Sequence, residues 1–414
     1  MPAMDLSPDE RRIADGADGA AKAMAMRLVS ETGRLLGAQR LLPIVSSHVD
    51  GCLYHGDSGT YFAERLASDG GQVAVPTTLN VGALDLLHPD RVKGDAHHRE
   101  MSLRMMRAYE MLGCRPTWTC APYQAGHRPA VGTDVAWGES NAVAFCNSVL
   151  GARTNRYGDF LDIACALVGR APDYGLHRAE NRRATVVVDA SGLSPALRNA
   201  DVFYPVLGTW LGAEIGAEIA AIDGLPPKQG EDRLKALGAA AASAGAVGLF
   251  HVVGSTPEAP TLTAATQAGP TRAIRLTPEM VRTARDRLST ARDGAIDCVA
   301  LGSPHFSEAE FAALKRLASG RRFRVPLYVC TRRDLVERED LSGLEAAGAL
   351  IVADTCVVVT PILPAGAGTL MTNSGKFAHY GPANLGYDVV YGSLEDCVAS
   401  AVEGRVVRDE SVWR

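Results

Sequence analysis

Two patterns of apolar and polar positions alternate along most of the chain. Short apolar runs predict buried strands, and stretches with apolar residues three and four positions apart predict helices. Strands are expected at 41–46, 72–76, 117–120, 184–188, 246–253, 296–301, 324–330 and 350–359. Helices are expected from Ser7 to about 36 and at 61–67, 98–112, 141–150, 160–168, 202–222, 230–244, 278–288 and 333–347, with another beginning after Ser307.

Two of these helix starts carry a complete local signature. Ser7 is followed by a proline at the first helical position and by Glu10 three residues on, which is the spacing of a capping box. Ser307 has Glu310 at the same spacing. Both serines are therefore predicted to cap a helix.

The order of strands and helices predicts the fold class. Strands that alternate with helices of about ten to fifteen residues are typical of parallel βαβ units. The chain is therefore predicted to be an α/β protein made of several parallel-sheet βαβ subdomains. After Arg183 the pattern of predicted strands and helices changes. We therefore expect an N-terminal region at 1–183, a central region at 184–290 and a C-terminal region at 291–414.

Composition excludes several classes of protein. The 414 residues carry a formal net charge of −5 and show no basic run, which argues against a nucleic-acid partner. No apolar run reaches the roughly 18 residues of a membrane span, and the N-terminus lacks the pattern of a secretory signal. Nine scattered cysteines without a signal peptide favour a reducing compartment, and we expect a cytoplasmic protein.

One stretch, 119–156, is unusually rich in reactive and polar side chains. It combines a thiol, a carboxylate, amides and guanidinium groups among Gly and Pro. Such groups are costly to bury without partners, so the stretch is interpreted as a binding or catalytic surface. Arg153 and Arg156 could grip a carboxylate there, or could form ion pairs with Asp159 or Asp162.

Other polar groups are expected near the carboxyl ends of strands, where α/β sheets bind ligands. They are Gly56, Asp57, Ser58, Asn80, Ser303 and Cys356. An ordinary helix cap is the favoured alternative for Gly56–Ser58 and an equal alternative for Glu139 and Ser140. Lys376 could neutralise a substrate anion or could be a solvated loop residue. No Walker A loop, GxGxxG motif or CxxC pair occurs.

Taken together, these segments resemble the large subunit of aconitase X, a branch of the aconitase superfamily. The resemblance covers about 44–407. Its most specific motifs are Thr119-Cys120-Ala121-Pro122-Tyr123, Glu139-Ser140-Asn141-Ala142-Val143, Asn147-Ser148-Val149-Leu150-Gly151-Ala152-Arg153-Thr154-Asn155-Arg156, Gly302-Ser303-Pro304-His305, Asp354-Thr355-Cys356 and Ser374-Gly375-Lys376.

The resemblance implies an aconitase-like fold around a central cleft and a hydro-lyase activity. It implies dehydration of cis-3-hydroxy-L-proline to 1-pyrroline-2-carboxylate, with mevalonate 5-phosphate as the alternative substrate. It also implies a small subunit that completes the active site and supplies a serine as base. No small β-rich domain is apparent after Val407, so this partner is expected to be a separate chain. A non-catalytic anion-binding subunit is the alternative from another class.

The resemblance further implies an iron–sulfur cluster, with ligands that match Cys120 and Cys356. The third family position holds Ser303 here, which leaves a 2Fe–2S cluster or a mononuclear iron as smaller alternatives. Cys298 cannot replace that ligand, because an odd step of five residues on a strand turns its side chain to the opposite face, about 16 Å away. Cys52, just before the Gly56 loop, is the expected substitute.

In the mechanism that the resemblance implies, iron acts as Lewis acid for the departing hydroxyl. Lys376, Glu139 and Ser140 are the expected catalytic residues, with Lys376 stabilising charge on the substrate carboxylate. The expected substrate contacts are Gly56, Asp57, Ser58, Asn80 and Ser303.

Overall fold

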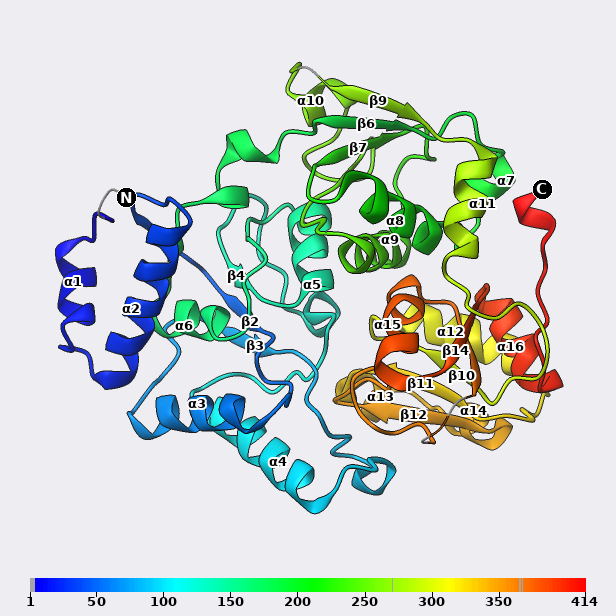
Figure 1. Ribbon diagram of the computed structural model, residues 1–414, viewed down its shortest axis with the longest axis horizontal. Coiled ribbons are helices and arrows are strands. Elements are labelled where there is room, and N and C mark those ends of the chain that lie inside the picture. The colour runs from blue at the N-terminus through cyan, green and yellow to red at the C-terminus, as the bar shows by residue number, and fades with distance from the viewer. Residues whose placement is uncertain (1–3, 270, 365, 367) are drawn as a thin grey trace. The chain divides into compact units, whose positions relative to one another are not determined.

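The computed structural model describes residues 4–269, 271–364, 366 and 368–414. The chain divides into two compact units. Unit 1 comprises Met1–Leu84 and Gly94–Arg182, and unit 2 comprises Asp85–Lys93 and Arg183–Arg414. Both units contain parallel sheets accompanied by helices, so the prediction of several parallel α/β subdomains is confirmed (Figure 1).

Unit 1 is built on a small parallel sheet of three strands in the order β3-β2-β4. These strands are β2 (Ser47–Val49), β3 (Thr77–Leu79) and β4 (Ala136–Trp137). An antiparallel pair joins β1 (Leu41–Pro43) to β5 (Arg170–Pro172). The helices of this unit are α1 (Pro8–Ala14), α2 (Ala20–Leu35), α3 (Asp57–Ser68), α4 (Ala96–Met111), α5 (Ser140–Phe145) and α6 (Leu161–Val168).

Unit 2 holds two wholly parallel sheets. The first has the order β8-β7-β6-β9, with β6 (Val186–Asp189), β7 (Ala220–Asp223), β8 (His251–Val252) and β9 (Arg272–Arg275). The second has the order β12-β11-β10-β13-β14, with β10 (Cys298–Leu301), β11 (Leu327–Thr331), β12 (Ala349–Ala353), β13 (Thr369–Thr372) and β14 (Asp388–Tyr391).

The helices of unit 2 connect and cover these sheets. They are α7 (Pro195–Asn199), α8 (Phe203–Ile215), α9 (Glu231–Ala244), α10 (Leu262–Thr266), α11 (Pro278–Asp286), α12 (Glu308–Ala318), α13 (Arg333–Arg338), α14 (Ser342–Ala347), α15 (Gly375–Leu385) and α16 (Leu394–Glu403). In Figure 1, α8 and α9 lie side by side below β6 and β7. Their close approach requires Gly208, because a Cβ there would stand 2.2 Å from the carbonyl oxygen of Leu237.

The second sheet of unit 2 has the most extensive apolar core. Every residue of β10 and β11 is buried, as expected for parallel strands that are covered on both faces. Phe311 and Leu314 of α12 pack with Leu327 and Val329 of β11 in this core. Among the described residues, no helix has both the length and the apolarity needed to span a bilayer.

Both predicted capping boxes are confirmed. The Ser7 hydroxyl accepts the backbone N–H of Glu10, and the Glu10 carboxylate accepts the N–H of Ser7 at 2.9 Å. Ser307 and Glu310 make the same reciprocal pair at the start of α12, at 3.1 and 2.8 Å. The local sequence therefore determines where these two helices begin.

Some predicted element boundaries are wrong. The single helix from Ser7 to 36 is interrupted between α1 and α2, where Gly16 and Gly19 adopt φ values of 97° and 95° that favour glycine. The predicted helix at 202–222 ends at Ile215, and its last residues form β7 instead. The predicted helix at 333–347 is divided into α13 and α14.

Two predicted strands of unit 1 also differ from the structure. The strand expected at 72–76 begins further along the chain, at Thr77, where pairing with β2 starts. Before it, the N–H groups of Val73 and Ala74 donate to the carbonyls of Leu112 and Ala166 instead. The strand expected at 117–120 is absent from this described segment, where Trp118 has a φ of 42°. Apolar runs therefore located buried segments here without identifying their hydrogen-bond partners.

Candidate active site

The parallel sheet of unit 1 delivers three polar side chains to its carboxyl edge. His48 lies opposite Thr78 on one side and Trp137 on the other. Two residues further along the three segments come Asp50, Asn80 and Glu139. We call these last three residues the acceptor row. Their place at the end of parallel strands agrees with the edge at which α/β sheets bind ligands.

The acceptor row is held together by short contacts. The Asn80 amide donates to Oδ1 of Asp50. The backbone N–H of Asp50 donates to Oδ2 of Asp162 at 2.6 Å. Gly138 is required beside this contact, because a Cβ there would stand 2.4 Å from Oδ2 of Asp162 and 2.9 Å from Cβ of Asp50. Glu139 caps α5, and its Oε2 accepts the N–H of Ala142 at 2.6 Å.

Burial and like charges dominate the electrostatics around Asp50. Burial raises its pKa to about 8, with further increases from the carboxylates of Glu139, Asp159 and Asp162, while the hydrogen bond from Asn80 lowers it. Burial also raises the pKa of Asp162 to about 7, although backbone hydrogen bonds oppose the shift. This part of unit 1 is therefore strongly acidic in its potential.

Cys52 lies beside this region as a buried thiol. Its Sγ lies 3.4 Å from the carbonyl oxygen of Asn80 and 3.5 Å from that of Val49, both of which accept from the thiol. Burial, with the nearby charges of Asp50 and Asp162, raises the pKa of this thiol well above its ordinary value. A metal ligand must be a thiolate, so these surroundings give no support to the predicted metal role of Cys52.

The predicted Gly56–Ser58 loop begins α3. Gly56 precedes the helix with a φ of 148°. The Asp57 carboxylate accepts the Tyr54 hydroxyl at 2.8 Å and lies 2.9 Å from Nε2 of His97. These two hydrogen bonds lower the pKa of Asp57. Ser58 is exposed.

A hydrogen bond between Cys120 and Asn141, the residue after Ser140, brings two predicted motifs of unit 1 together. The carbonyl oxygen of Cys120 accepts the Asn141 side-chain amide at 2.8 Å, and Ser140 is the first residue of α5. Cys120 is buried, with 5% of its surface exposed. The motif containing Cys120 is therefore connected directly to the motif containing Glu139.

Unit 2 brings together Cys356, Ser303 and Lys376. The pKa of Cys356 is lowered to about 7, first by a hydrogen bond from Cys330 and then, against the opposing effect of burial, by the Val358 N–H, the Lys376 charge and Ser303. Ser374 caps α15 and donates its hydroxyl to the carbonyl of Ser303, which fixes the first turn of the helix; Lys376 lies in that turn and not in a loop. The cluster can hold a thiolate and an ammonium group close together.

Two buried residues, His305 and Asp354, make contacts next to this cluster. His305 lies 3.1 Å from the Thr355 carbonyl through its Nε2, and burial lowers its pKa to about 3, so the ring is neutral. Asp354, with a φ of 63°, forms an ion pair with Arg333. Both contacts restrain the turn that presents Cys356.

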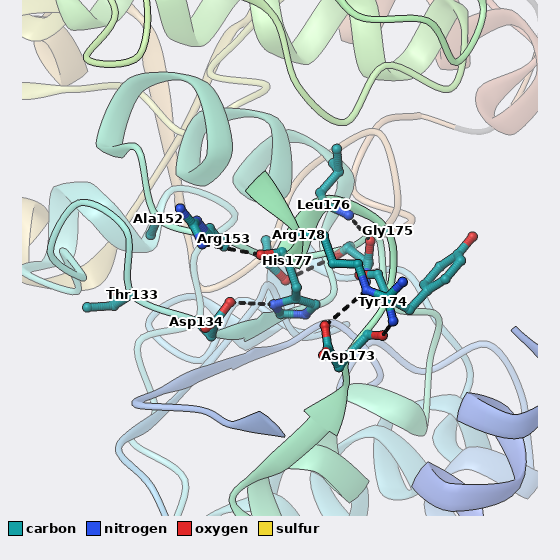
Figure 2. Close-up of polar contacts among 12 residues, drawn as sticks. Thr133, Asp134, Ala152, Arg153, Asp173, Tyr174, Gly175, Leu176, His177 and Arg178 are labelled. Carbon is teal, nitrogen blue, oxygen red and sulfur yellow. Dashed lines mark hydrogen bonds and ion pairs between the residues drawn. The ribbon is translucent and has the colours of Figure 1, made fainter. Parts of the chain in front are cut away.

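Much of the polar stretch at 119–156 has a structural role. Nδ1 of His177 lies 2.8 Å from Oδ1 of Asp134, and Arg153 donates to the His177 carbonyl at 3.4 Å; Figure 2 draws both contacts. Asn155 donates to the Tyr174 carbonyl at 2.9 Å. These contacts attach the 153–155 segment to the 173–178 loop. This Arg153 hydrogen bond goes to a backbone carbonyl and not to a carboxylate, and Arg156 is exposed.

The structure reveals three residues of these clusters that the sequence reasoning missed. Asp50 directly follows β2, so its position at a strand end was a usable signal. Asp162 lies in an otherwise apolar helix, α6, and is fully buried. Cys330 is the fourth residue of a buried strand, β11, and gave no sign of its contact with Cys356.

Comparisons with known proteins identify the family. Family models of the aconitase X first, second and third domains match residues 3–180, 184–286 and 296–403. The chain is 43% identical to the cis-3-hydroxy-L-proline dehydratase of Pseudomonas aeruginosa, over 99% of this chain and 72% of that protein. The chain belongs to the aconitase X family. The predicted family and the prediction of a dehydratase are confirmed.

Other aconitase X proteins extend this relationship. The chain is 39% identical to the cis-3-hydroxy-L-proline dehydratase of Hypocrea jecorina, over 97% of this chain and 69% of that protein. It is 37% identical to the phosphomevalonate dehydratase large subunit of Methanothermobacter thermautotrophicus, over 93% of this chain and 96% of that protein. The solved holo-form of Thermococcus kodakaraensis aconitase X has a TM-score of 0.85 and 33% identity, covering 96% of this chain and all of that one.

Membership of the aconitase superfamily points to an iron–sulfur centre, and the cysteines differ in how well they suit one. Cys356 fits, because its neighbours favour the thiolate that iron requires. The Cys52 thiol donates to the carbonyls of Val49 and Asn80, and its metal role stays a prediction. Within the described part of the chain, no group of three or more His, Cys, Asp or Glu side chains is arranged to hold a metal.

Proposed function

We propose that this aconitase X chain is the large component of a hydro-lyase that dehydrates cis-3-hydroxy-L-proline to 1-pyrroline-2-carboxylate. The observation that carries the proposal is the cluster of Cys356, Ser303 and Lys376 in unit 2, which unites the predicted site residues of that unit. The relatives named as hydroxyproline dehydratases are also more similar to the chain than those named as phosphomevalonate dehydratases.

The reaction removes the proton on C2 and the hydroxyl group on C3 of the ring. These leave together as water, a C2=C3 double bond forms, and a proton shift from nitrogen to C3 gives the cyclic imine. We assign to Lys376 the stabilisation of the substrate carboxylate as negative charge develops during proton removal. Cys356 in unit 2 and Cys120 in unit 1 are each proposed as an iron ligand, and iron would supply a Lewis acid for the departing hydroxyl group.

We assign Glu139 and Ser140 to the same reaction as groups that bind substrate or move a proton. Asn80, Gly56, Asp57, Ser58 and Ser303 are the proposed substrate contacts. The base itself is proposed to come from a small partner subunit, since the archaeal relatives are named as large subunits. A 2Fe–2S cluster or a mononuclear iron is the proposed form of the metal, because Ser303 stands at the third ligand position.

The second candidate substrate is mevalonate 5-phosphate. It is favoured by the coverage of the archaeal large subunits, 96% of the Methanothermobacter protein. The deciding experiment is anaerobic assay of both compounds with the chain alone and with its small partner. Dehydration of the hydroxyproline only with the partner would support the proposal. The proposal would be refuted if the protein dehydrated mevalonate 5-phosphate but not the hydroxyproline. It would also be refuted if iron-loaded protein dehydrated neither compound.

A further inference from the structure

The acceptor row of unit 1 follows from the register of three neighbouring strands. His48, Thr78 and Trp137 are paired across β2, β3 and β4. Side chains two residues apart on a strand point to the same face. The acceptor row comes two positions later, just beyond the ends of these strands, and the hydrogen bond from Asn80 to Asp50 shows that two of its side chains meet.

The row presents oxygen acceptors whose capacity is only partly used. The Asn80 amide group donates to one oxygen of Asp50, which fixes the orientation of the amide. Oδ1 of Asn80 is then buried without a hydrogen-bond partner, in a residue that is only 3% exposed. Leaving a buried acceptor without a donor is unfavourable, so a donor from a ligand is expected there.

The charge around this acceptor favours a cation. Asp50 is a residue of intermediate burial that directly follows the end of β2. Asp159 and Asp162 add negative potential at Asp50. A ligand that brings both N–H donors and positive charge would satisfy the Asn80 oxygen and offset the repulsion among the carboxylates.

We propose that Asp50 and Asn80 bind the ring ammonium of the substrate and thereby select a cyclic amino acid. A ring ammonium has two N–H donors. Its positive charge would hold the Asp50 carboxyl ionised, so that the second Asp50 oxygen and Oδ1 of Asn80 supply two acceptors. Mevalonate 5-phosphate has no ammonium and carries a dianionic phosphate, which the acidic surroundings would repel. The proposal rests on the proposed function, because it takes cis-3-hydroxy-L-proline as substrate.

The test compares two ring compounds that differ at a single atom. L-proline carries the ring ammonium, and (S)-tetrahydrofuran-2-carboxylate has a ring oxygen in its place. Calorimetric binding to the iron-loaded protein with its small partner should favour L-proline by at least tenfold. Asp50→Asn should reduce that preference to within twofold. Asp15→Asn, which removes an equal charge from an exposed residue elsewhere in unit 1, should preserve it.

Several results would overturn the proposal. Equal binding of the two compounds, no binding of L-proline, or an undiminished preference in folded Asp50→Asn would each do so. Saturable binding of Mg²⁺ or Ca²⁺ that disappears in Asp50→Asn would assign the row to a metal ion instead. The wild-type comparison needs no variant, so it stands even if Asp50→Asn fails to fold, which thermal melting would show.

The same experiments separate this inference from the proposed function. If the protein does not dehydrate cis-3-hydroxy-L-proline but binds L-proline selectively through Asp50, the proposed reaction fails and the ammonium site stands. If dehydration occurs and the ring nitrogen makes no difference to binding, the ammonium site alone fails. In steady-state assays, the site predicts that Asp50→Asn raises KM for the hydroxyproline at least tenfold, with a smaller change in kcat.

Discussion

Gly138 offers a direct test of how tightly the acceptor row is packed. Gly138→Ala would place a Cβ 2.4 Å from Oδ2 of Asp162 and 2.9 Å from Cβ of Asp50. Ordinary contacts begin near 3.4 Å, so the two side chains must move apart by several tenths of an ångström or more. The neighbours are fixed, because the Asp162 carboxylate is held by the Asp50 N–H at 2.6 Å.

The magnitude follows from the cost of overpacking. One extra methyl group in a packed interior costs about 1–3 kcal/mol. For a domain of this size, each kcal/mol lowers Tm by roughly 2–4 °C. The displaced Asp50 should also weaken binding of L-proline, since the hydrogen bond to Asn80 depends on its position. We therefore expect Gly138→Ala to lose both stability and ligand affinity.

Thermal and urea unfolding would measure this effect against Gly158→Ala. Gly158 lies in the same unit, and a Cβ there would meet nothing within 4 Å. The control should change Tm by less than about 2 °C, in keeping with surface substitutions. A Tm for Gly138→Ala equal to that of the control would refute the reasoning, because it would mean that the Asp162 carboxylate yields without cost.

Three further predictions concern other parts of the chain. Lys235→Met should cost about 2 kcal/mol in urea unfolding, because Lys235 is 2% exposed and its removal leaves the Glu310 carboxylate, whose side chain is 23% exposed, without this ion-pair partner; a loss below about 1 kcal/mol would contradict this. Burial lowers the pKa of His127 to about 4, so the folded state resists protonation and stability should fall as pH drops from about 6.5 towards 4. At about 1.4 kcal/mol per pKa unit, the loss of folding free energy amounts to about 3 kcal/mol. It should largely disappear in His127→Gln. If the stability of both proteins changed with pH in the same way, the role assigned to His127 would be wrong. Cys356→Ser should lose bound iron measured by elemental analysis, while Cys397→Ser, which changes a fully buried thiol of α16, should retain it; equal iron in both would exclude Cys356 as a ligand.

The sequence was sufficient to predict features determined by neighbouring residues. The capping boxes at Ser7 and Ser307 were predicted because each involves only four consecutive positions. The interruption at Gly16 and Gly19 was missed, since an apolar pattern can continue through a break when both halves bury the same face. The start of β3 at Thr77 was missed because strand pairing depends on partners far away in the sequence.

Candidate site residues that stand in a recognisable motif were predicted, and those outside a motif were missed. Cys356 and Lys376 stand in motifs, and the structure places them together in unit 2. Cys330 stands in an uninterrupted apolar strand, where a thiol reads as a small hydrophobe. Asp162 stands in an otherwise apolar helix, and the sequence suggested it as an ion-pair partner of Arg153 or Arg156 rather than as an acceptor for the Asp50 N–H.

The acceptor row shows which kind of information the sequence withholds. Glu139 alone is an ordinary helix cap, and the structure confirms that it does cap α5. Asn80 alone is an amide after a short strand, and Asp50 alone precedes a loop. Their common significance comes from the register that sets His48 beside Thr78 and Trp137, because a shift of one residue on any strand would turn that strand's side chain to the opposite face. The register therefore does more than position a backbone: it decides whether three unremarkable polar residues form one binding surface or none.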